Sequence, residues 1–133
     1  MNEEKFNERL EKALKLNKGN LDDNILEFAE IYHFLTNRYL KLLNKINEVE
    51  IKLQERFAER YSYYKVDYEI QLTSQEIKMF IDNDKETQDL RLKLKNLKSL
   101  ADVTEKQMKN IEQARWDAKN LIPLKRIPRY WNV

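Results

Sequence analysis

The sequence predicts an all-α protein whose long, heptad-bearing helices assemble into an oligomeric bundle or barrel. Apolar residues recur at alternating steps of three and four in two separate stretches, and this spacing places them on one stripe of a helix. The 133 residues include one glycine and two prolines, so few turns are available. A charged fraction of 36% together with periodic apolar residues is typical of long helices rather than of a disordered chain.

The two apolar stripes form the predicted oligomerisation surface. The first stripe comprises Ile25, Phe28, Tyr32, Leu35, Tyr39, Leu42, Ile46, Val49 and Leu53. The second stripe comprises Leu90, Leu94, Leu97, Ala101, Thr104, Met108 and Ile111. A helix from Leu21 to about Tyr64 is roughly 65 Å long, whereas a compact domain of this length has a radius of gyration of about 14 Å. We therefore expect that one molecule does not bury its own stripes completely and that several copies pack together.

The first half of the chain carries clear helix start and stop signals. A first helix is predicted from Glu3 to Leu16, with Asn2 as its cap and acidic residues in its first turn. Residues 17–19 end this helix, because their glycine tolerates the left-handed closing conformation. Asn20 then caps the long helix that runs to about Tyr64.

The second half begins with a segment whose secondary structure the apolar periodicity does not decide. Residues 66–72 alternate apolar and polar side chains, which predicts either a short extended strand or a linker that packs one face down. Residues 73–76 form a capping box that starts a short helix. Asp84, at the end of an acidic break, caps a final long helix from about Lys85 to Leu121. Pro123 is expected to stop that helix.

These signals divide the chain into two predicted parts. Residues 1–122 form a helical domain that carries the predicted oligomerisation surface, and residues 123–133 form a basic and aromatic tail that Pro128 keeps extended. The start of the sequence is charged and lacks the apolar core of a secretion signal. The longest apolar run, 79–81, is far too short to span a membrane. A soluble protein of the cytoplasm is therefore expected, with no membrane partner.

Residues that carry catalysis or bind metals are scarce. The absence of cysteine excludes a disulfide framework, a thiolate zinc site and a cysteine nucleophile. His33 is the only histidine, and its place beside the first stripe suits the flank of a helix interface. Asp82, Asp84 and Glu86 resemble the start of a calcium loop without its glycine and distal glutamate, which favours a hydrated helix break. No enzyme activity, metal or cofactor is expected.

A basic and aromatic segment at the end of the first long helix is the main candidate for binding. Its members are Arg56, Arg60, Tyr61, Tyr63, Tyr64 and Lys65. Single-stranded nucleic acid is held by this combination, because cations follow the phosphates while bases stack on rings. The alternative is that the tyrosines fill a wide helical core, and the composition does not separate the two.

A second basic group lies at the start of the final helix. Arg91, Lys95 and Lys98 share one helical face by their spacing of four and three, and no acidic residue occurs between positions 90 and 101. Either a stripe that tracks phosphates or a solvated face paired with neighbouring acids explains this pattern. The net charge of +2 does not by itself indicate nucleic acid.

In the order and spacing of its motifs, the chain resembles the UvsY family of recombination mediators from tailed phages. The resemblance rests on the arginine-tyrosine element 60–64 after a long helix, the segment 76–86 before the last helix, and the end of that helix at 111–122. It implies a helical, ring-shaped oligomer of about six or seven subunits. It also implies binding to single-stranded DNA, to a single-strand-binding protein and to a RecA-like recombinase.

Within the arginine-tyrosine element, the resemblance implies a basic pair that contributes to DNA binding. Arg60 matches one member of the pair, and Ala58 stands at the position of the other. Arg56 and Lys65 are the cations nearby that are able to compensate.

The predicted function is that of a non-enzymatic recombination mediator. It would help to load a RecA-like recombinase onto single-stranded DNA that is covered by single-strand-binding protein. Weak contacts from each subunit of a ring would sum through multivalency. The alternative is a structural or adaptor protein whose coiled coil binds partner helices, which accounts for both stripes without DNA.

Overall fold

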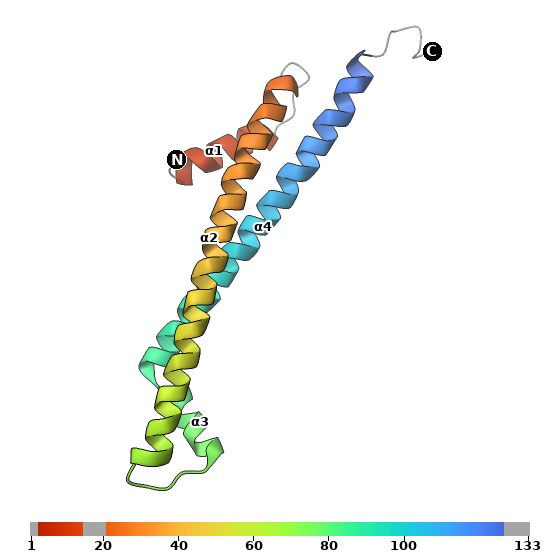
Figure 1. The fold of residues 1–133 in the computed structure, drawn as a ribbon. Coiled ribbons are helices and arrows are strands. Elements are labelled where there is room, and N and C mark those ends of the chain that lie inside the picture. The colour runs from red at the N-terminus through yellow and green to blue at the C-terminus, as the bar shows by residue number, and fades with distance from the viewer. Residues whose placement is uncertain (1–2, 15–20, 127–133) are drawn as a thin grey trace. The chain divides into compact units, whose positions relative to one another are not determined.

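The computed structural model describes the backbone of residues 3–14 and 21–126, and the side chains of residues 3–9 and 25–120. The elements are α1 (Glu3–Leu14), α2 (Leu21–Ser62), the π-helical turn η2 (Tyr63–Asp67), α3 (Ser74–Asp82) and α4 (Lys85–Arg126) (Figure 1). The described residues contain no β-strand. The all-α prediction is confirmed.

The predicted helix ends hold in part. α1 and α2 begin near the predicted residues, while the caps Asn2 and Asn20 and the stop signal at 17–19 lie outside the described residues. The prediction that the last helix stops before Pro123 is wrong, because α4 continues to Arg126. Proline removes one backbone hydrogen bond, and so close to the helix end the remaining turns keep the helical conformation. Residues 123–126 are therefore helical, and the rest of the predicted tail lies outside the described residues.

Between α2 and α3 the chain forms a linker and not a strand. The last turn of α2 widens into η2, whose end is marked by a hydrogen bond from the Tyr68 N–H to the Tyr63 carbonyl at 3.0 Å. Tyr68 is extended, with φ −74° and ψ 140°. Of the two alternatives for residues 66–72, the linker is the one observed.

Side-chain caps start both helices of the second half. The Thr73 hydroxyl accepts a hydrogen bond from the Glu76 N–H, and the Glu76 carboxylate accepts one from the Thr73 N–H, each at 3.2 Å. Asp84 caps α4 by accepting from the Thr87 N–H at 3.0 Å and from the Thr87 hydroxyl at 2.8 Å. Both predicted start signals are confirmed.

The chain divides into two compact units, and the first is formed by residues 1–39 and 103–133. Its core contains Phe6 from α1, Phe28, Ile31 and Leu35 from α2, and Ile111, Ala114 and Ala118 from α4. The small alanines let the α4 backbone approach its neighbours closely. Ion pairs from Arg38 to Glu3 and from Arg9 to Glu27, both at 2.6 Å, join α1 to α2, which α1 crosses obliquely (Figure 1).

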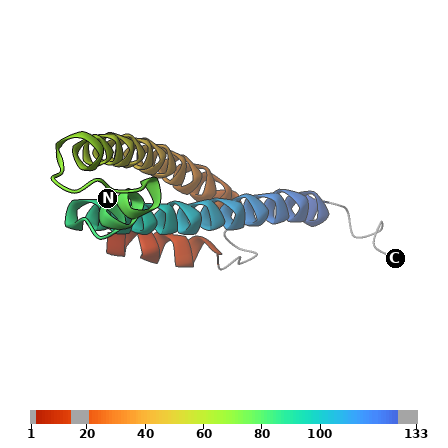
Figure 2. The same ribbon diagram turned by 90° about the horizontal axis from the view of Figure 1, so that it is seen from below.

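The second unit comprises residues 40–102. It contains the second half of α2, η2, α3 and the first part of α4, and α3 folds back beside the start of α4 (Figure 2). Its buried residues are Leu42, Ile46, Val49, Ile77, Ile81, Thr87 and Ala101. All the residues of the predicted nucleic-acid site belong to this unit.

The apolar stripes are partly buried within the single chain, and packing between copies stays a prediction. Eight stripe residues are buried within the single chain: Phe28, Leu35, Leu42, Ile46, Val49, Ala101, Thr104 and Ile111. The others are half-buried: Ile25, Tyr32, Tyr39, Leu53, Leu90, Leu94, Leu97 and Met108. In the first unit, the two stripes pack on each other within one molecule. One molecule therefore covers part of each stripe and leaves the half-buried members incompletely covered, as the sequence predicts.

Candidate nucleic-acid interface

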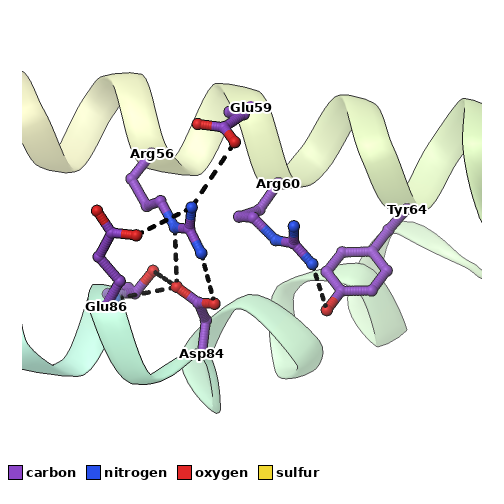
Figure 3. A network of polar contacts seen from close by, with 7 residues as sticks. Arg56, Glu59, Arg60, Tyr64, Asp84 and Glu86 are labelled. Atoms are coloured by element: carbon purple, nitrogen blue, oxygen red, sulfur yellow. Dashed lines mark hydrogen bonds and ion pairs between the residues drawn. The ribbon is translucent and has the colours of Figure 1, made fainter.

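Arg56, near the end of α2, is enclosed by carboxylates. Its Nε and Nη2 donate to Asp84 at 3.0 and 2.9 Å, and its Nη1 lies 3.0 Å from Glu86 and 3.7 Å from Glu59 (Figure 3). The hydrogen bonds from Arg56 hold the pKa of the Asp84 carboxyl well below its ordinary value, although burial opposes this shift. The same pair raises the pKa of the Arg56 guanidinium. Arg56 thus joins α2 to the start of α4.

Arg60, one turn further along α2, faces rings instead of carboxylates. Its guanidinium carbon lies 4.6 Å from the centre of the Tyr63 ring and 4.9 Å from that of Tyr64, and its Nη2 donates to the Tyr64 hydroxyl at 3.1 Å. No ion pair joins Arg60 to any residue whose side chain is described, and its buried Nε has no hydrogen-bond partner there. The positive charge is therefore positioned without being neutralised.

Four rings form a cluster around this arginine. Tyr64 stacks on Phe80 of α3 with ring centres 5.3 Å apart and an interplanar angle of 25°. Tyr63 and Tyr68 complete the cluster through edge contacts. The wider η2 turn brings Tyr63 and Tyr64 round to Tyr68. Tyr63 and Phe80 are 39% and 40% exposed, so two faces of the cluster meet solvent.

Tyr61 and Lys65 form a neighbouring contact. The Lys65 ammonium lies 5.7 Å from the centre of the Tyr61 ring, which also stacks near Phe57 at 5.9 Å. The Tyr61 hydroxyl shares a hydrogen bond of 3.3 Å with Ser74 at the start of α3. Lys65 is exposed and forms no ion pair within residues 25–120. Of the two cations able to compensate for Ala58, Lys65 has its charge available, whereas Arg56 does not.

The second predicted basic group lies together in one open groove on α4. Arg91, Lys95 and Lys98 line this groove. Arg91 pairs with Asp82 at 2.9 Å, and Lys98 lies 3.8 Å from Glu50. Lys95 has no ion-pair partner in the described part of the chain. Arg91 and Lys98 thus have acidic partners, whereas Lys95 keeps its charge available; phosphate binding by this group stays a prediction.

The structure also places the remaining candidate residues. His33 is exposed and lies 3.3 Å from the Asn37 amide nitrogen. Across the described residues, no three His, Cys, Asp or Glu side chains are grouped to hold a metal ion. None of the helices in those residues is long and apolar enough to cross a membrane. Tyr68 and Phe80 are the rings of the cluster that the sequence prediction did not include, because a local pattern does not show their contacts with Tyr63 and Tyr64.

Comparison with known proteins gives concordant results. A family model described as "Recombination, repair and ssDNA binding protein UvsY" matches residues 9–129. Two crystal structures of the recombination mediator protein UvsY from bacteriophage T4, in lattice types IV and II, each match with a TM-score of 0.75. Their sequence identities to this chain are 18% and 17%. Each match covers 94% of this chain, and it covers 97% and 96%, respectively, of the T4 chains. A search of curated proteins gave no match.

The structural likeness shows that the fold is shared, at an identity too low to show more. The family model spans nearly the whole sequence, from the second half of α1 past the end of α4. This chain belongs to the UvsY family.

Proposed function

We propose that this protein binds single-stranded DNA and acts as a recombination mediator. In this role it helps to load a RecA-like recombinase onto DNA that is covered by single-strand-binding protein. Membership of a family described by recombination, repair and single-stranded DNA binding supports this proposal. At the residue level, the proposal rests on the surroundings of Arg60. Its guanidinium lies against the rings of Tyr63 and Tyr64 and has no carboxylate partner in the described residues.

The proposed contact uses both parts of this arrangement. Arg60 and Lys65 meet the phosphates, while a base stacks on the exposed edge of the ring cluster at Tyr63 or Phe80. Lys95 and its groove partners form a second row of phosphate contacts. Arg56 contributes indirectly, because its carboxylate partners hold the end of α2 against the start of α4.

Each such site is weak alone, so the proposal includes assembly of several copies. A homo-oligomer of about six or seven subunits would present the same rings and cations repeatedly, and binding would strengthen through effective concentration. The role is one of binding and presentation and requires no catalytic group.

The test is binding of a fluorescently labelled single strand, measured by anisotropy over a series of salt concentrations. The parent is expected to bind with an affinity that falls steeply with salt, because each neutralised phosphate releases counterions. Arg60→Ala should weaken binding about tenfold at low salt and reduce the logarithmic salt slope by about 0.7. Arg60→Lys should keep that slope while losing affinity, because it keeps the charge without the planar contact to the rings.

Lys52→Ala is the matched control, since Lys52 is an exposed cation on the same helix away from the rings. Circular dichroism of each variant checks that the helices are intact. If the parent shows no salt-sensitive binding to single strands, the adaptor alternative is correct. If Arg60→Ala and Lys52→Ala bind alike, the ring cluster is not the DNA site.

A further inference from the structure

Trp116 occupies an unusual place in the first unit. It lies on α4, is 62% exposed, and lines an open groove. The described residues around this groove are Lys109, Glu112, Gln113, Arg115, Trp116 and Lys119. Tryptophan is enriched at binding surfaces, because its ring is large and apolar while its N–H is polar.

The charges beside Trp116 are not balanced within the groove. Hydrogen bonding to its acid, Glu112, raises the pKa of the Tyr32 hydroxyl of α2, while the nearby charge of Arg115 opposes this shift. Lys109 lies 3.5 Å from Glu105 in an exposed pair along the helix. Arg115 and Lys119 form no ion pair with any residue whose side chain is described, and the buried Nε of Arg115 has no hydrogen-bond partner there. Arg115, which directly precedes the exposed ring, and Lys119, one turn after it, therefore carry positive charge without an acidic partner among the described residues.

The surroundings of Trp116 favour an anionic ligand over a second copy of this chain. All the other described residues that line the groove are polar or charged, whereas a helix face that packs against another helix places its aromatic ring among apolar neighbours. Available cations next to an exposed indole complement a ligand that carries both negative charge and flat rings.

We propose that this groove is a second contact site for single-stranded DNA, in which a base stacks on Trp116 while Lys119 and Arg115 hold the flanking phosphates. The inference rests on the proposed function, but it uses residues of the other compact unit and none of the ring cluster around Arg60. It gives each subunit two places at which to hold a strand.

The chain offers a direct spectroscopic test, because it contains only two tryptophans. In a Trp131→Phe variant, all tryptophan fluorescence comes from Trp116. Titration with an oligothymidylate is expected to quench this emission in a saturable manner. An abasic strand of the same length should bind through its phosphates and produce little quenching, because it has no bases to stack.

Affinity measurements by anisotropy complete the test. Trp116→Ala should weaken binding about fivefold or more, and Trp116→Phe should retain most of the affinity because it keeps a ring. Lys119→Gln should lower the salt slope while Trp116 remains quenched by the strand. Gln113→Ala, a neighbour without charge or ring, is the matched control.

Three results would overturn the inference. The first is a Trp131→Phe variant whose emission the oligonucleotide does not change, together with a Trp116→Ala variant that binds as tightly as the parent. If Arg60→Ala still weakens binding, this result leaves the proposed function standing. The second is a shift of Trp116 emission with protein concentration in the absence of DNA, which would assign the groove to a second copy. The third is a parent that does not bind the oligonucleotide at all, which would remove the proposed function as well.

Discussion

At the scale of single residues, two arginines one turn apart on α2 have opposite surroundings. Arg56 is bound by Asp84 and Glu86, whereas Arg60 lies against Tyr63 and Tyr64. The sequence predicted both as DNA contacts because they share one basic and aromatic segment. Arg56 has a structural role because Asp84 and Glu86, at the start of α4, bind it, and Arg60 lies in a ring cluster that includes Phe80 of α3. A local sequence pattern does not show these contacts.

This difference predicts different effects on stability. Arg56→Ala leaves the half-buried Asp84 without its partner and should lower the free energy of unfolding by about 2–3 kcal/mol. Arg60→Ala loses ring contacts and one hydrogen bond and should cost about 1 kcal/mol. Urea unfolding followed by circular dichroism measures both. Equal losses in the two variants would contradict the structural role of Arg56.

The pair also predicts how stability depends on pH. Because the pKa of Asp84 in the folded protein lies below its ordinary value of 3.8, the unfolded chain takes up a proton first as the pH falls. The contribution of the pair is therefore complete above about pH 5 and declines as the pH drops below about 4. Unfolding free energies at a series of pH values should show this decline in the parent and a weaker one in Asp84→Asn. Parallel curves for the two proteins would refute the assignment.

At the scale of elements, start signals were predictable and irregular segments were not. The caps Thr73 and Asp84 were found from sequence because their hydrogen bonds link residues only three positions apart. The alternation in 66–72 left strand and linker open, since a strand requires a partner that no local pattern reveals. The turn η2 had no signal of its own, yet it gathers the rings of the candidate site.

The capping box before α3 carries a prediction at this scale. Thr73→Ala removes the side-chain acceptor for the Glu76 N–H and should lower the free energy of unfolding by about 1 kcal/mol. Gln75→Ala, an exposed change in the same helical turn, should have little effect. Denaturant unfolding compares the two. Because α3 supplies Phe80 to the rings, Thr73→Ala should also weaken DNA binding slightly if that cluster is the site.

At the scale of the whole molecule, the heptad stripes predicted the helices correctly but did not show which helices each stripe packs against. Phe28 and Leu35 pack with Ile111 of the same chain. Spacing along a helix defines an apolar stripe, but it does not tell whether that stripe meets another helix of the same chain or of another copy.

Apolar side chains outside the predicted stripes remain exposed in each of the two units. On α2 they include Leu26, Leu40, Leu43 and Ile51, and on α4 they include Leu92 and Val103. Burial of such residues between copies would favour the oligomer on which the proposed DNA binding depends.

The mass of the protein in solution, measured at micromolar concentration with and without an oligonucleotide, tests this account most directly. We predict a discrete assembly of several copies that gains the mass of bound single strand at low salt and loses it at high salt. A stable single subunit that takes up no oligonucleotide at any salt concentration would contradict it.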